Sequence, residues 1–167
     1  MNAAFYSALI RQSESAYAGH AASVMIEADP ALEARFAPGA HGRWQDNNAQ
    51  RMRELAAALD AQAPMAFGAQ MAWNAHAFQV RGLSVEDLEA ALKALESILA
   101  AELPGDAASV LGPYFEAARE ALHSGERSVQ SVLNPADETD RPVLKYMAMA
   151  LEGRQDDAVD FVREIAA

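Results

Sequence analysis

Apolar residues recur at three- and four-residue steps along most of the chain, which is the spacing of one helix face. The clearest stripe consists of four leucines at steps of four, three and four: Leu88, Leu92, Leu95 and Leu99. Ser84 can cap this helix, and Asp87 three residues later makes a variant of the capping box. No segment alternates in the manner of a strand. The pattern therefore predicts an all-α fold, a multi-helix bundle of about six to eight helices with a C-terminal helical hairpin.

Turn and capping residues divide the chain into segments. We expect helices over residues 2–28, 30–36, 44–62, 64–82, 84–103, 106–124, 140–153 and from about 156 onward. A loop is expected over 37–43, which holds two glycines and a proline, and Gly112-Pro113 predicts a kink or a restart. The expected organisation is a helical bundle domain over 1–125, a connector over 126–140 and a hairpin over 141–167. The hairpin is expected to pack on the bundle, as a separate part or as part of one single domain.

The segment 64–82 differs from the other expected helices because its apolar residues point in every direction. Pro64 suits a first helical turn, and Gly82 suits a C-terminal cap. The large apolar side chains cannot share one stripe: Met65, Phe67, Met71, Trp73, Phe78 and Val80. A helix that is apolar all round is expected to be surrounded by other helices. We therefore predict that this helix is the enclosed centre of the bundle.

Polar side chains on this helix make it the candidate ligand site. His76 lies three residues after Trp73, with Asn74 and Gln70 nearby. A neutral imidazole here can ligate a haem or bond a planar ligand stacked on Trp73. The same four side chains can instead satisfy one another inside the core. Both interpretations are left open, and Gln70, Trp73, Asn74 and His76 are the predicted ligand-binding residues.

Other constellations point away from catalysis. Glu120 and His123 form a Glu-x-x-His pair, but the second pair that a di-iron bundle needs is missing. His20 is expected in the core beside Tyr17, and His41 on a solvated loop. No Gly-x-Ser-x-Gly elbow or glycine-rich phosphate loop is found. We predict no catalytic residues, no metal site and no enzymatic activity.

Charge and composition restrict the partners. The net charge is −11, and the second half carries most of it: residues 84–167 hold seven basic and seventeen acidic residues. An acidic surface argues against binding to nucleic acid or to anionic membranes. There is no cysteine, hence no disulfide or thiolate site. No signal peptide or membrane span is visible. We expect a cytoplasmic protein with a protein partner, and a homodimer is a natural possibility.

Several short motifs occur in a familiar order after the tryptophan-bearing helix: Arg81-Gly-Leu-Ser-Val-Glu-Asp-Leu88, Leu103-Pro-Gly-Asp106, Pro113-Tyr-Phe115, Arg141-Pro-Val-Leu-Lys-Tyr146 and Leu151-Glu-Gly153. This order resembles the helical N-terminal region of bacterial cobalamin-binding regulatory proteins, mainly over 70–167. The resemblance implies that 141–167 corresponds to the first half of the four-helix cap over the corrinoid. The Asp-x-His-x-x-Gly motif and the α/β domain that carries it are absent from the sequence. The resemblance implies a fragment of a longer regulator or a stand-alone relative.

Two functions follow as expectations. The first is a non-enzymatic helical sensory or protein-interaction module of a bacterial regulatory protein, without a cofactor. The alternative is a small-molecule receptor that binds a tetrapyrrole, of the haem or cobalamin type, or an apolar ligand next to Trp73 and His76. No ligand motif in the sequence supports cobalamin or haem directly.

Overall fold

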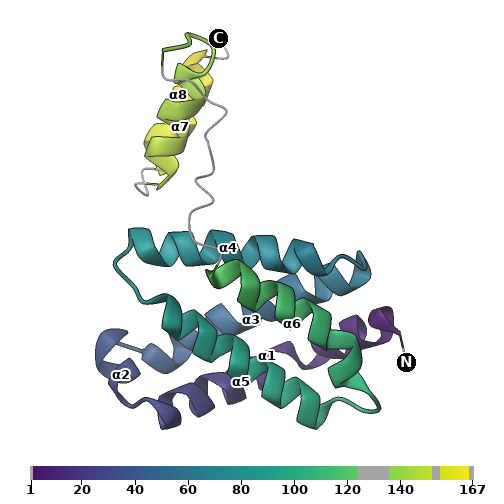
Figure 1. The fold of residues 1–167 in the computed structure, drawn as a ribbon. Coiled ribbons are helices and arrows are strands. Elements are labelled where there is room, and N and C mark those ends of the chain that lie inside the picture. The colour runs from purple at the N-terminus through teal and green to yellow at the C-terminus, as the bar shows by residue number, and fades with distance from the viewer. Residues whose placement is uncertain (1, 124–135, 152–154, 166–167) are drawn as a thin grey trace. The chain divides into compact units, whose positions relative to one another are not determined.

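The structure, a computed structural model, describes residues 2–123, 136–151 and 155–165 (Figure 1). These residues form eight helices and no strand, which confirms the all-α fold. The helices are α1 (Ala3–Ala28), α2 (Ala31–Arg35), α3 (Ala40–Asp60), α4 (Pro64–Val80), α5 (Val85–Glu102), α6 (Ala107–His123), α7 (Arg141–Leu151) and α8 (Gln155–Ile165). The chain divides into two compact units, Met1–Glu126 and Arg127–Ala167, and each is described by itself.

In the first unit, α1 packs along α3 and α5, and α4 packs along α6 (Figure 1). Three aromatic contacts mark the interior. The Trp44 ring lies 5.1 Å from Phe36 and 6.2 Å from Phe78, and the Phe67 ring meets Phe115 edge-on at 6.0 Å. These contacts join α3 to α4 and α4 to α6, so the helices share one continuous core.

The prediction of a loop over 37–43 is wrong for residues 40–43. Only residues 37–39 are non-helical, and α3 begins at Ala40. Gly39 has φ +82°, a conformation that suits glycine, and its carbonyl accepts a hydrogen bond from the Arg43 N–H at 3.1 Å. The connection between α2 and α3 is therefore only a few residues long and includes a left-handed glycine next to the start of α3. His41, expected on this loop, lies in the first turn of α3.

Glycine also sets the spacing of α4 and α6. A Cβ atom built on Gly68 would lie 2.8 Å from the carbonyl oxygen of Ala117. The two backbones therefore approach more closely than any other residue at position 68 would permit. This contact fixes which side of α4 faces the core.

The restart expected at Gly112-Pro113 is wrong, because α6 continues from Ala107 to His123. The kink expected there as its alternative stays a prediction. Pro113 is exposed, whereas Leu111, Tyr114 and Phe115 on either side of it are buried. Packing of this apolar face keeps the segment helical despite the lost amide donor. The predicted cap of α6 is confirmed, since Asp106 accepts from the Ser109 N–H at 3.3 Å.

The second unit contains α7 and α8, which contact each other. Both helices of the hairpin expected over 141–167 are present, and the turn between them lies outside the described residues. Most of the connector expected over 126–140 also lies outside them. The packing of this hairpin on the bundle stays a prediction.

Candidate functional site

Helix α4 has one buried side and one exposed side, so the prediction that it is enclosed all round is wrong. Its buried residues are Phe67, Gly68, Met71, Asn74, Ala75 and Phe78. Met65, Trp73 and Val80 are 66%, 61% and 74% exposed. Large apolar residues occupy the solvent side of α4 as well as its core side. Their distribution in the sequence therefore led to the wrong prediction of an enclosed helix. The exposed stripe follows steps of four, four, three and four through Met65, Ala69, Trp73, His76 and Val80.

The structure separates the four predicted ligand-binding residues. Gln70, Trp73 and His76 lie on the exposed side of α4, whereas Asn74 is buried at 5% exposure. The Asn74 side-chain amide donates to the Gln70 carbonyl oxygen at 2.8 Å, one turn earlier in the same helix. The four side chains therefore do not converge on one cavity. Their role toward a ligand stays a prediction, now as part of an open surface.

Two of the other three histidines, His20 and His41, differ from expectation. His20 is exposed, so its predicted place in the core is wrong: α1 packs on α3 and α5 with residues such as Ala18 and Ala22, and His20 lies outside this face. The His41 Nε2 atom lies 3.1 Å from the Ser23 hydroxyl oxygen. His123 lies 3.6 Å from Glu89. Across the residues that the structure describes, no three His, Asp or Glu side chains are grouped as metal ligands would be.

Helix α4 differs from its neighbours in charge. It contains no Asp, Glu, Lys or Arg in seventeen residues, whereas each of the other helices assigned here carries at least one. We call the exposed residues Met65, Ala69, Trp73, His76 and Val80 the α4 stripe. In a chain of net charge −11, this stripe is a mainly apolar strip without Asp, Glu, Lys or Arg on the surface of the first unit.

A cavity that the sequence did not predict lies between α1, α2 and α5. Its volume is about 740 Å³. Its apolar lining includes Val24, Met25, Ala28, Leu32, Ala90 and Ala94, and its polar lining includes Asp29, Arg35, Ser84, Glu86, Asp87, Lys93 and Ser97. We call it the α1–α2–α5 cavity. The α4 residues are not among these lining residues.

Ion pairs fix the polar end of this cavity. The Arg35 guanidinium donates to Asp29 and to Asp87, each at 2.7 Å. The hydrogen bond from Arg35 holds the pKa of Asp29 below its usual value, and both carboxylates raise the pKa of Arg35. The hydrogen bond from the Ser84 hydroxyl likewise lowers the pKa of the Glu86 carboxyl. The positive charge of Arg35 is thus matched within the protein.

The role of Asp87 corrects the expected capping box. Ser84 does cap α5, but its hydroxyl oxygen accepts from the Glu86 N–H at 3.2 Å. Asp87, 7% exposed, instead pairs with Arg35 across 52 positions of sequence. Local sequence could explain an acid at a helix start, whereas nothing in the sequence pointed to a distant arginine. This long-range ion pair is the part of the cavity that sequence reasoning missed.

Within the described ranges, no helix combines the length and apolar character needed to cross a lipid bilayer. Comparison of the chain with protein-family models, with curated proteins and with solved structures gave no match. The resemblance to cobalamin-binding regulatory proteins accordingly stays a prediction from the sequence motifs.

Proposed function

We propose that the chain is a non-enzymatic helical module of a bacterial regulatory protein, and that it binds a protein partner through the α4 stripe. The observation that carries this proposal is an exposed helix face with a tryptophan and a methionine and with no charged residue on the whole helix. The sensory role and the bacterial source are supported by the motif resemblance alone.

The chemistry of the stripe favours a protein partner. The centres of protein interfaces are depleted of charged residues and enriched in aromatic residues and methionine. Tryptophan is also the residue type that most often dominates binding energy. Trp73 lies at the middle of the stripe, between Met65 and Val80. A partner with an apolar helix face would cover all three side chains at once.

The rigid support of the stripe adds to this argument. The opposite side of α4 is fixed by the close contact of Gly68 with Ala117 and by the ring contact of Phe67 with Phe115. Trp73 and its neighbours are therefore presented on a helix whose rotation is set by the core. A preorganised surface loses less conformational entropy on binding.

The test begins with affinity capture from the native host, followed by purification of the captured protein and calorimetric titration. Trp73→Glu places a charge at the centre of the stripe and should weaken binding at least about 100-fold, as expected for a central aromatic residue. Ala57→Glu adds the same charge at an exposed position of α3 and should leave the affinity unchanged. Failure to capture a partner, or equal affinity of the Trp73→Glu variant, would contradict the proposal.

A second candidate, a small-molecule receptor, is favoured by the α1–α2–α5 cavity. Its volume of about 740 Å³ lies within the range of small-molecule sites, and apolar side chains form much of its lining. The ligand chemistry that fits is an apolar molecule, because Arg35 is already paired with Asp29 and Asp87. No histidine is found among the lining residues, so this cavity gives no support to a histidine-ligated haem.

Two probes separate the cavity from the site predicted at Trp73 and His76. Anilinonaphthalene sulfonate, an anionic dye whose aromatic rings fluoresce in apolar sites, should bind the wild-type chain and be excluded from the cavity by Ala90→Trp, which fills it. Haem and cobalamin are added in parallel, and the visible spectrum is compared with that of His76→Ala. A spectral change that disappears with His76→Ala would support the tetrapyrrole site. Dye binding that is unaffected by Ala90→Trp would contradict the cavity as a receptor site.

A further inference from the structure

The C-terminal hairpin exposes most of its large apolar side chains. Helices α7 and α8 are strongly amphipathic, yet Ala158 is their only buried residue among those whose burial is described. Six large side chains remain between 42% and 56% exposed: Val143, Tyr146, Met147, Val159, Val162 and Ile165. The contact between α7 and α8 therefore covers only part of their apolar surface.

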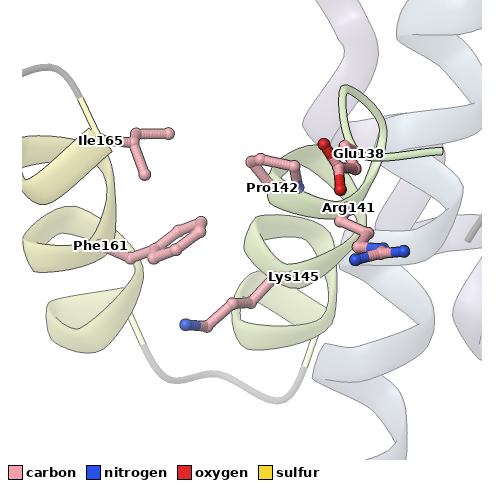
Figure 2. Close-up of a pocket in the computed structure, with 6 residues that line it drawn as sticks. All are labelled: Glu138, Arg141, Pro142, Lys145, Phe161 and Ile165. Carbon is pink, nitrogen blue, oxygen red and sulfur yellow. The ribbon is translucent and has the colours of Figure 1, made fainter.

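Two short helices cannot maintain such a surface in water by themselves. Each has eleven residues, below the length at which an isolated helix is stable. The side that closes the hairpin includes a shallow cavity lined by Pro142 and Lys145 of α7 and by Phe161 and Ile165 of α8 (Figure 2). There the Lys145 ammonium lies 4.3 Å from the Phe161 ring centroid. A cover for the remaining apolar side must come from outside the hairpin.

The two helices of the hairpin carry opposite net charges. Helix α7 carries two basic residues, Arg141 and Lys145, and no acid. Helix α8 carries four acidic residues and a single basic residue, Arg163. When two hairpins meet about a two-fold axis with each α7 against the other α8, opposite charges face each other at both contacts. The reverse arrangement, α8 against α8, would bring like charges together.

We propose that the partner of this surface is a second copy of the chain, and that two hairpins associate into an antiparallel four-helix bundle with α7 beside the partner's α8. Net charge favours the hairpin over the first unit as the site of self-association. Residues 141–167 carry four basic and five acidic residues, whereas residues 1–126 carry eight basic and sixteen acidic residues. Two nearly neutral hairpins can approach without the repulsion that the acidic first units would impose.

The available surface is sufficient for a modest dimer. The six half-exposed side chains of the two copies together offer roughly 900 Å² of apolar area, and a polar rim brings the total near the lower bound of about 1,200 Å² for stable interfaces. An interface of this size is compatible with a Kd on the order of 1 µM. The proposal concerns a different surface from the α4 stripe and does not depend on it.

The oligomeric state of the full chain tests the proposal. Sedimentation equilibrium at about 100 µM should give twice the chain mass of 17.9 kDa, since this concentration is well above a micromolar Kd. Val159→Glu/Val162→Glu changes two exposed residues of α8 and should raise the Kd at least about 100-fold. The control Met65→Glu/Val80→Glu changes two exposed residues of the α4 stripe and should leave the Kd unchanged.

Charge reversal provides a second test that keeps the apolar surface intact. Arg141→Glu/Lys145→Glu and Asp160→Lys/Glu164→Lys should each weaken the homodimer about 10-fold or more by placing like charges at both contacts. An equimolar mixture of the two variants should form a heterodimer, because the reversed α7 then faces the reversed α8 and the two unaltered helices face each other. Circular dichroism of each variant confirms that it is helical.

The outcomes are distinct. A monomeric wild-type chain, a dimer that survives both sets of hairpin variants, or a dimer lost only in Met65→Glu/Val80→Glu would overturn the proposal. The last result would show self-association through the α4 stripe instead. Dimer loss in the hairpin variants with recovery in the mixture supports it, whether or not the α4 stripe binds another protein.

Discussion

The first unit and the C-terminal hairpin use the same apolar periodicity with opposite results. In the first unit, the buried sides of α1 to α6 meet in one core, where Tyr6, Trp44 and Phe115 are at most 1% exposed. In the hairpin, two strongly amphipathic helices bury only Ala158 among the residues whose burial is described. The difference teaches that an apolar stripe specifies a surface to be covered, whereas the number of neighbouring helices within a unit decides how much of that surface the unit covers by itself.

The largest effect is expected from the core of the first unit. Phe115→Ala removes a fully buried ring that packs on Phe67 and should lower the free energy of unfolding by about 3–5 kcal/mol. The matched change in the hairpin, Phe161→Ala, should alter the same transition by less than about 0.5 kcal/mol, because Phe161 belongs to the other unit. Urea unfolding followed by circular dichroism measures both. Equal losses would show that the two units unfold as one.

A smaller effect is expected where α4 meets α6. Gly68→Ala drives a Cβ atom against the Ala117 carbonyl oxygen and should destabilise the first unit by about 1–3 kcal/mol. Gly42→Ala in α3 meets nothing within 4 Å and should gain about 0.5–1 kcal/mol from helix propensity. Thermal unfolding of both variants measures these changes in stability. An unchanged stability of the Gly68→Ala variant would mean that α4 and α6 can move apart freely.

The exposed side of α4 should contribute little to folding. Trp73→Phe removes a side chain that is 61% exposed and should change stability by less than about 0.5 kcal/mol. The fluorescence lost with Trp73 should be that of a solvated indole with long-wavelength emission, whereas the remaining emission comes from buried Trp44. A large loss of stability would show that Trp73 is covered within the chain and that the α4 stripe is not a free surface.

The smallest expected change concerns one carboxyl group. Arg35→Met removes the hydrogen bond that lowers the pKa of Asp29, so this pKa should rise toward its ordinary value of 3.8. Because the folded pKa is lowered, the stabilisation is present above the ordinary value and is lost as the pH falls through the folded pKa. Carbon NMR titration of the carboxyl groups measures the shift. Asp137 in the second unit, whose pKa is lowered by the Thr139 N–H, should titrate as before.

Sequence periodicity predicted the helices because each stripe is a local property. The leucine stripe of α5 is buried as expected, with Leu88, Leu92 and Leu99 at most 1% exposed. Boundaries failed where a single backbone conformation decides them. The φ of +82° at Gly39 starts α3 early, and the packing around Pro113 keeps α6 continuous. Neither feature can be read from residue type alone.

The candidate site was less predictable because it depends on which side of α4 the core occupies. The composition of α4 favoured enclosure, yet Gly68 and Phe67 turn one side inward and leave Trp73 and His76 outside. The α1–α2–α5 cavity depends on contacts between residues more than fifty positions apart, such as Arg35 with Asp87. Local patterns in a single sequence do not predict contacts between residues so far apart.

The hydrogen bond from the Tyr6 hydroxyl to the Pro104 carbonyl oxygen, 3.0 Å long, joins positions 98 residues apart. During synthesis, the first helix therefore emerges long before the turn between α5 and α6 that anchors it. Because closing a loop of this length costs conformational entropy, we expect this contact to form late in folding. The amide protons in the middle of α1, where Ile10, Ala18 and Ala22 are buried, should exchange slowly with solvent, which hydrogen exchange measures.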